Sequence, residues 1–153
     1  MIIMFAVFFM QTNLVADDFI LYGNTTIGKP KTMEVKPKPI MIPMICTGYD
    51  LGVQSCGKSY NNPNRGITRS GKNINGLSRE QVLIVASTRY KIGTKLKIIF
   101  PKGYEQYNNI YTVEDHGNFP EDVLDLYIGD FGEQTGQETI SFGRVSVKVE
   151  ILK

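Results

Sequence analysis

Two aspartates, ten positions apart, are the residues of this sequence most suited to acid–base chemistry. Asp115 lies within residues 111–118 and Asp125 within residues 123–128, and both segments are otherwise typical of buried strands. Moving a carboxylate out of water disfavours its charged form and raises its pKa. Sequences mainly tolerate that cost where the acid has a chemical role or a partner. The pattern therefore indicates that these two carboxylates mark the functional site.

The two aspartates are expected to have different roles. Asp125 is flanked by Leu124 and Leu126 on a predicted strand, so burial should raise its pKa towards the range of a general acid. Asp115 precedes a turn at Gly117, where we expect more exposure and a role in stabilising positive charge or orienting Asp125. Two structural alternatives stay open, because Asp115 could be a turn-forming residue and Asp125 could be satisfied by loop amides.

The single histidine and the two cysteines add further candidates. His116, beside Asp115, could assist proton transfer or could be a solvated turn residue. Cys46 and Cys56 lie in a Gly-rich segment and would fit a disulfide in an exported protein. The alternative is a pair of buried reduced thiols. Two thiols and one distant histidine make a poor zinc site, so we expect no metal and no cofactor.

Length and charge limit the classes of function. The chain has 153 residues, a length sufficient for one domain with a hydrophobic core. Its formal net charge is +2. Its lysines and arginines are scattered, whereas a surface that binds nucleic acid needs a concentrated basic stripe. We therefore expect no nucleic-acid partner. The sequence carries no indication of the oligomeric state.

The N-terminal third differs from the rest in composition. Residues 1–16 are mainly apolar and too short to span a bilayer, so a signal peptide cleaved after Ala16 is the preferred interpretation. No basic residue precedes the apolar run, which leaves a mis-started reading frame or a core strand as alternatives. Residues 17–43 contain several prolines and lysines and are predicted to be a semi-rigid linker. The folded domain is then residues 44–153, without stable membrane insertion once the leader is removed.

The domain has the pattern of an all-β protein. Apolar, β-branched or alternating segments predict strands, and Gly, Asn, Ser and Pro predict a long loop over residues 54–75. The predicted strands are residues 41–49, 81–86, 95–100, 110–114, 123–128 and 144–152. Residues 133–141 could form a short helix, and residues 78–81 have a capping-box shape, although the apolar run after them favours a strand. We expect a six-stranded barrel with long Gly/Asn-rich loops and at most one or two short helices, because closure hides the sheet edges.

Seven short motifs occur in an order that resembles a known family. They are CTGY at 46–49, SCGK at 55–58, GITRSG at 66–71, IGT at 92–94, VEDHG at 113–117, LDLY at 124–127 and FG at 142–143. This series resembles the three-aspartate (3D) domain, which is related to membrane-bound lytic transglycosylase A. The resemblance covers about residues 44–152 and implies a double-psi β-barrel.

The resemblance also implies an activity. Asp115 and Asp125 match two family aspartates that face a groove holding the peptidoglycan glycan chain. The family reaction cleaves the β-1,4 bond between N-acetylmuramic acid and N-acetylglucosamine and leaves a 1,6-anhydro end. Glycoside hydrolysis needs a pair of carboxylates, but a nucleophile on the same sugar gains effective concentration without a water. One acid can then donate a proton to the leaving oxygen and later accept one from the attacking hydroxyl.

Other matched positions are expected to contact the substrate. The loop of residues 66–71 could bind N-acetyl groups through its hydroxyls and backbone, and the alternative is a Gly-bounded turn. The substrate-binding candidates are Thr68, Ser70, Gly71, Thr94, His116 and Gly117.

Two departures from the family pattern keep other functions open. Ala86 or Ser87 occupies the position of the family's first aspartate, and His116 replaces the threonine of its Asp-Thr-Gly motif. The leading interpretation is an exported, extracellular or cell-wall-associated enzyme that cleaves peptidoglycan. An enzyme associated with a phage or a spore is included in this interpretation. A cell-wall-binding module without turnover and a structural adaptor barrel are the alternatives.

Overall fold

The computed structural model describes residues 38–152. The predicted leader (1–16) and residues 17–37 of the predicted linker lie outside the described residues. Within the described range, no helix is both long and apolar enough to cross a membrane.

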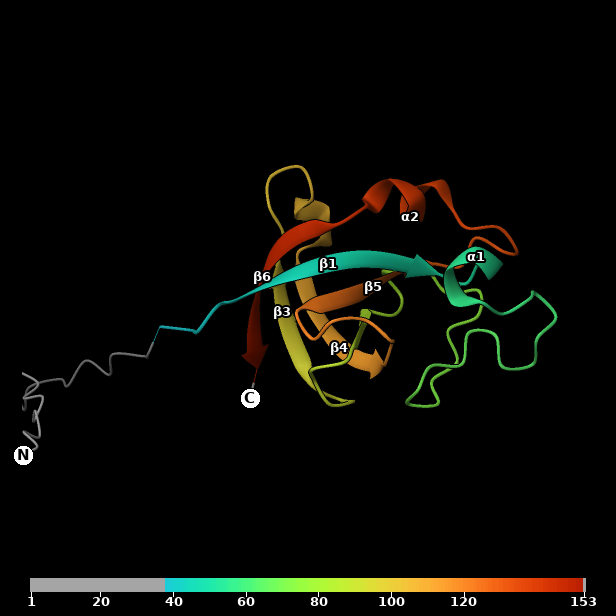
Figure 1. The fold of residues 1–153 in the computed structure, drawn as a ribbon, viewed down its shortest axis with the longest axis horizontal. Coiled ribbons are helices and arrows are strands. Elements are labelled where there is room, and N and C mark those ends of the chain that lie inside the picture. The colour runs from blue at the N-terminus through green and yellow to red at the C-terminus, as the bar shows by residue number, and fades with distance from the viewer. Residues whose placement is uncertain (1–37, 153) are drawn as a thin grey trace, which may run out of the picture. The chain divides into compact units, whose positions relative to one another are not determined.

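Six strands form a closed barrel in the order β1-β5-β2-β4-β3-β6 (Figure 1). The strands are β1 (Ile42–Asp50), β2 (Ile84–Ser87), β3 (Lys95–Ile99), β4 (Asn109–Asp115), β5 (Val123–Gly129) and β6 (Val145–Leu152). The β1–β5 and β2–β4 pairs are parallel, and the other four pairs are antiparallel. Closure leaves each strand hydrogen-bonded on both sides, which removes exposed sheet edges.

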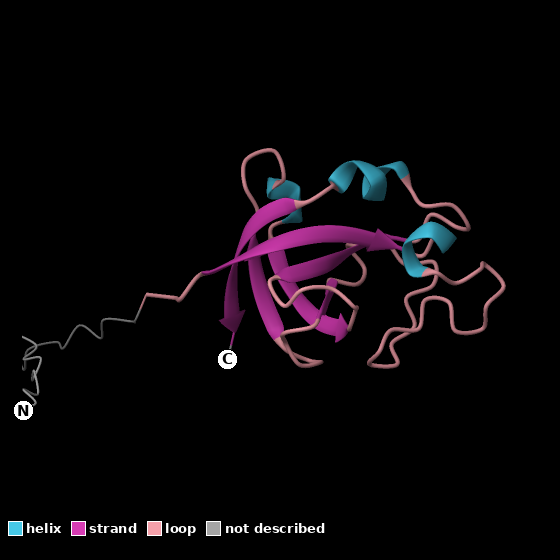
Figure 2. Cartoon of the chain, viewed as in Figure 1, coloured by secondary structure: helices cyan, strands magenta, loops and turns pink. Residues whose placement is uncertain are grey.

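Three short helical elements lie between the strands (Figure 2). They are helix α1 (Val53–Cys56), the 3-10 turn η1 (Glu105–Tyr107) and helix α2 (Gln137–Phe142). The expected mostly β fold with a closed six-stranded barrel and at most two short α-helices is confirmed.

Side-chain alternation accounts for the strands. Along β6, Val145, Val147 and Val149 are buried in the barrel, whereas Ser146 and Lys148 between them are exposed. Strand β3 alternates in the same way. Successive side chains of a strand point to opposite faces, so this pattern presents one apolar face to the barrel interior and one polar face to solvent.

A second, smaller core lies outside the barrel interior. It consists of Leu51, Ile74, Val82, Ile84 and Tyr127. The Tyr127 hydroxyl also donates a hydrogen bond of 2.8 Å to the carbonyl oxygen of Leu77. This core fastens the long connection between α1 and β2 to the outside of the barrel.

The helices differ in detail from the sequence prediction. Helix α2 begins after Gly136, which is its N-cap and donates its N–H to Asp50 Oδ2 at 2.7 Å. The predicted loop over residues 54–75 begins instead with α1. No helix follows the capping-box residues, although the Ser78 N–H does donate to the Gln81 side chain at 2.7 Å. The chain makes turns there instead, through the Gln81 and Val82 N–H groups, and Val82 packs into the smaller core.

Candidate functional site

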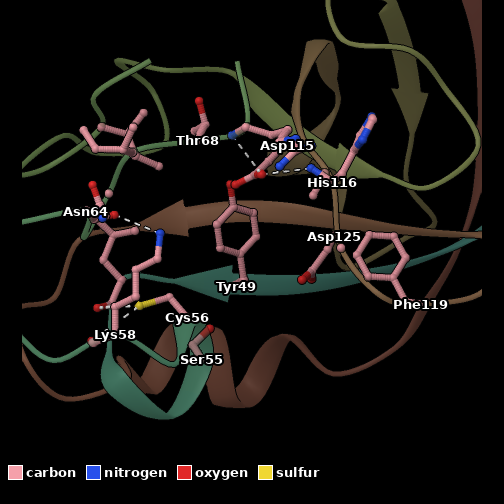
Figure 3. Close-up of a pocket in the computed structure, with 17 residues that line it drawn as sticks. Tyr49, Ser55, Cys56, Lys58, Asn64, Thr68, Asp115, His116, Phe119 and Asp125 are labelled. Atoms are coloured by element: carbon pink, nitrogen blue, oxygen red, sulfur yellow. Dashed lines mark hydrogen bonds between the residues drawn. The ribbon is translucent and has the colours of Figure 1, made fainter. Parts of the chain in front are cut away.

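A pocket of about 530 Å³ opens where β1, β2, β4 and β5 approach the connection between α1 and β2 (Figure 3). Its walls include Tyr49 on β1, Ala86 on β2, Asp115 on β4, Asp125 on β5 and Thr68 on the connection. Ligand pockets in proteins commonly measure about 300–1,000 Å³. This pocket therefore has the size of a site for a small molecule or for a few sugar units.

Strand β2 brings the two predicted acids to the same place. It lies between β4 and β5, and its residue Ala86 pairs with Asp115 on one side and with Asp125 on the other. Ala86 is buried and also lines the pocket. The two carboxylates therefore flank one small side chain.

Asp125 is held by a hydroxyl from the neighbouring strand. Thr47 lies opposite it in the parallel β1–β5 register, and Thr47 Oγ1 donates a hydrogen bond of 2.7 Å to Asp125 Oδ1. Burial raises the pKa of Asp125, and the charge of Asp115 adds to that effect, whereas the Thr47 hydrogen bond opposes it. Asp125 thus has the partly buried position and the raised pKa expected of a general acid.

Asp115 combines a turn role with a position in the pocket. Its Oδ1 accepts hydrogen bonds from the backbone N–H of Arg69 at 3.0 Å and of His116 at 2.8 Å. The bond from Arg69 ties the connecting segment to the end of β4. The bond from His116 is local, as expected for the turn-forming alternative. Both of these bonds reach Oδ1, whereas Oδ2 accepts no hydrogen bond from any residue between 38 and 152.

Tyr49 enters the same pocket from β1. In Figure 3 its hydroxyl points towards Asp115. Burial raises the pKa of the Tyr49 phenol well above its ordinary value, and the charges of Asp115 and then Asp125 raise it further. The phenol is therefore a neutral hydrogen-bond donor near two acids.

A buried arginine holds the connecting segment in place. Arg65 donates to the carbonyl oxygens of Leu51 and Gly132 and to the Asn75 side chain, and both of its terminal nitrogens reach the Asp130 carboxylate. The pKa of Asp130 is lowered to about 2, mainly by its hydrogen bonds with Arg65. The pocket wall formed by this segment is thus anchored to the barrel by a buried, bidentate ion pair.

The predicted substrate-binding residues separate into two groups. Thr68, His116 and Gly117 line the pocket together with the two aspartates. The structure does not bring the other three to its walls. Ser70 hydrogen-bonds Thr68 at 2.9 Å between side-chain oxygens. The backbone N–H groups of Gly71 and Thr94 close turns by donating to the carbonyl oxygens of Thr68 at 3.0 Å and of Lys91 at 3.1 Å. The side chain of His116 is exposed.

Several residues of the site were not predicted from the sequence. Thr47 belongs to one of the family-like motifs, but its contact with Asp125 depends on the β1–β5 register. Lys58, the last residue of the SCGK motif, and Phe119 also line the pocket, and neither was among the predicted site residues.

The two cysteines are free thiols, so the disulfide considered for them is absent. Cys46 is buried on β1 in the barrel core, and burial strongly raises the pKa of its thiol. Cys56, at the end of α1, lines the pocket and donates to the carbonyl oxygen of Leu51 at 3.3 Å. The two side chains therefore belong to different environments, one inside the barrel and one on the pocket wall.

Residues 38–152 contain no group of three or more His, Cys, Asp or Glu side chains that could hold a metal ion. No protein-family model matches the chain, and no curated protein matches its sequence.

Proposed function

We propose that this domain cleaves the glycan strands of peptidoglycan as a lytic transglycosylase, with Asp125 as its general acid and base. One observation carries the proposal: Asp125, with a raised pKa, lines the same pocket as Asp115. A carboxyl group whose pKa is raised stays protonated to a higher pH and can donate that proton to a leaving oxygen.

The reaction needs one proton donor and no water. Asp125 donates its proton to the oxygen of the β-1,4 bond, and the bond from the muramyl anomeric carbon to that oxygen breaks. The muramyl 6-hydroxyl then attacks the anomeric carbon, and the ionised Asp125 accepts the hydroxyl proton. The new bond closes the 1,6-anhydro ring, and Asp125 returns to its starting state. A hydrolase needs a second carboxylate to activate a water or to attack the sugar itself. Here the attacking hydroxyl belongs to the same sugar, so its high effective concentration takes the place of that second group.

Asp115 suits a supporting role. A negative charge near the anomeric carbon would stabilise the positive charge that develops as the glycosidic bond breaks. Its hydrogen bonds to the Arg69 and His116 amides hold the carboxylate in place on the pocket wall.

A second candidate function is glycan binding without turnover. It is favoured by the segment of Ala86 and Ser87, where the resembled family carries an acid at one position and this chain carries none; Ala86 lies between the two acids in the sheet. An apolar side chain there removes one charge from the network around the substrate.

The fold and the cellular setting belong to the same proposal. The two parallel strand pairs in a closed six-stranded barrel support a double-psi topology. The order of the seven motifs supports membership of the three-aspartate group. The apolar residues 1–16 support export to the cell wall or beyond.

Incubation with purified sacculi, followed by mass spectrometry of the soluble products, tests the function. Anhydro-muropeptides are the expected products, and the Asp125→Asn variant is the matched control that should release none. Products with reducing ends would show that the enzyme is a hydrolase and not a transglycosylase. Co-sedimentation without products would leave the binding module, and neither products nor binding would contradict both candidates.

A further inference from the structure

One buried polar atom of the pocket, the Tyr49 hydroxyl oxygen, has no hydrogen-bond partner among the described residues. A buried donor without a partner loses its hydrogen bonds to water and gains none in return, which costs stability. Native structures rarely contain such groups, so each one calls for an explanation such as a ligand.

The aromatic ring of Tyr49 does not need its hydroxyl for packing. The ring lies against Tyr127, with 5.5 Å between the ring centroids, and packs onto the smaller core. A phenylalanine would make the same contacts. The packing of the ring therefore gives no reason for the hydroxyl.

The Tyr49 hydroxyl points towards a hydrogen-bond acceptor, the Asp115 carboxylate (Figure 3). Both backbone bonds to this carboxylate reach Oδ1, and Oδ2 accepts none from any residue of the described range. A donor beside an acceptor suits a ligand hydroxyl, because one hydroxyl oxygen both accepts and donates a hydrogen bond. A single acetamido group fits less well, because the N–H and C=O of a trans amide point in opposite directions.

We propose that Tyr49 and Asp115 together hold one hydroxyl group of the bound sugar, with Tyr49 donating to it and Asp115 accepting from it. This subsite rests on the proposed function, because it takes the ligand to be a glycan chain. Tyr49 then fixes the orientation of the sugar relative to the Asp125 carboxyl on the neighbouring strand.

The test measures binding to peptide-free glycan strands by titration calorimetry, in an Asp125→Asn background so that the ligand stays intact. Tyr49→Phe removes only the donor. Asp115→Asn keeps an oxygen for the Arg69 and His116 amides and converts the open acceptor into a donor. Each variant is expected to weaken binding by about three- to tenfold, the equivalent of one hydrogen bond. The double variant is expected to lose little more than either single variant, because both residues hold the same group.

A stability measurement separates this role from a structural one. Tyr49→Phe should leave the melting temperature unchanged or higher, because its hydroxyl has no partner to lose. Tyr104→Phe is the matched control: it removes a hydroxyl that donates to the Phe142 carbonyl oxygen at 3.2 Å and does not line the pocket. This control should lower the melting temperature and leave glycan binding unchanged.

Three results would overturn the inference. Unchanged binding in Tyr49→Phe would remove the donor role, and independent, additive losses in the double variant would mean that the two residues hold different groups. In both cases the parent protein still binds glycan, so the proposed function survives. Absence of binding by the parent protein would overturn the proposed function and the subsite with it.

Discussion

Thr47 Oγ1 donates a hydrogen bond of 2.7 Å to Asp125 Oδ1 across the parallel β1–β5 pair. This bond favours the ionised carboxylate and lowers the Asp125 pKa, whereas burial raises it by the larger amount. One hydroxyl therefore limits how far the pKa of the proposed general acid rises.

Replacing Thr47 with valine removes that bond and keeps the shape of the side chain. We expect the pKa of Asp125 to rise further, so the acid stays protonated to a higher pH. The alkaline limb of kcat/KM against pH, measured on peptidoglycan, should shift to higher pH. Thr47→Ser keeps the hydroxyl and should resemble the parent protein. A limb that does not move in Thr47→Val would mean that Asp125 is not the group titrating there.

Asp125→Asn should abolish product release without weakening the fold. Because folding raises the pKa of Asp125 above its unfolded value, the stability this group contributes is present at low pH and lost as pH rises through the folded pKa. Asparagine does not ionise, so the variant should be at least as stable at neutral pH, and its advantage should shrink at acidic pH. Thermal unfolding across this pH range measures the difference. A lower melting temperature at neutral pH would contradict the direction of the pKa shift.

Ala86→Asp would introduce a third carboxylate between Asp115 and Asp125 in the sheet. Like charges raise one another's pKa, so the alkaline limb of the activity profile should again shift to higher pH. Because Ala86 is 5% exposed, we also expect a stability loss of about 1–3 kcal/mol. Ala86→Asn is the uncharged control of similar size. An equal shift of the pH profile in both variants would show that charge is not its cause.

Arg65→Met should destabilise the domain by about 3–5 kcal/mol, because it leaves the buried Asp130 carboxylate unpaired. The folded pKa of Asp130 is lowered from 3.8 to about 2, so its contribution is present above the unfolded pKa and lost as pH falls through that window. Urea unfolding should show this acid-dependent loss in the parent protein and a smaller one in the variant. Arg144→Met, at an exposed position, should change little. Equal stability of Arg65→Met and Arg144→Met would remove the anchoring role of Arg65.

Thiol titration should distinguish the two cysteines. Cys56 is partly exposed on the pocket wall, whereas Cys46 is buried with a raised thiol pKa. One thiol per chain should react in the native protein and two after unfolding without reductant. A bulky maleimide on Cys56 should block glycan binding in the parent protein and have no effect in Cys56→Ser. No reactive thiol after unfolding would mean that the two cysteines are bonded.

The boundary of β2 shows where local patterns lose accuracy. The apolar residues 81–86 predict a strand, whereas β2 occupies Ile84–Ser87. Val82 packs instead into the core outside the barrel. An apolar run indicates burial but does not indicate which of two cores receives each side chain.

Local sequence patterns were sufficient to predict most strands and to single out the two candidate acids. Side-chain alternation along β6 and the placement of Asp125 between leucines are local properties that can be read without knowing any distant contact. Which residues contact one another could be learned only from the folded chain. Thr47 and Asp125 are 78 positions apart, and their contact depends on the register of two parallel strands in a closed barrel. The order of strands around the barrel likewise places Ala86 between the two acids, because pairing is set by long-range packing and not by the residues next to each acid.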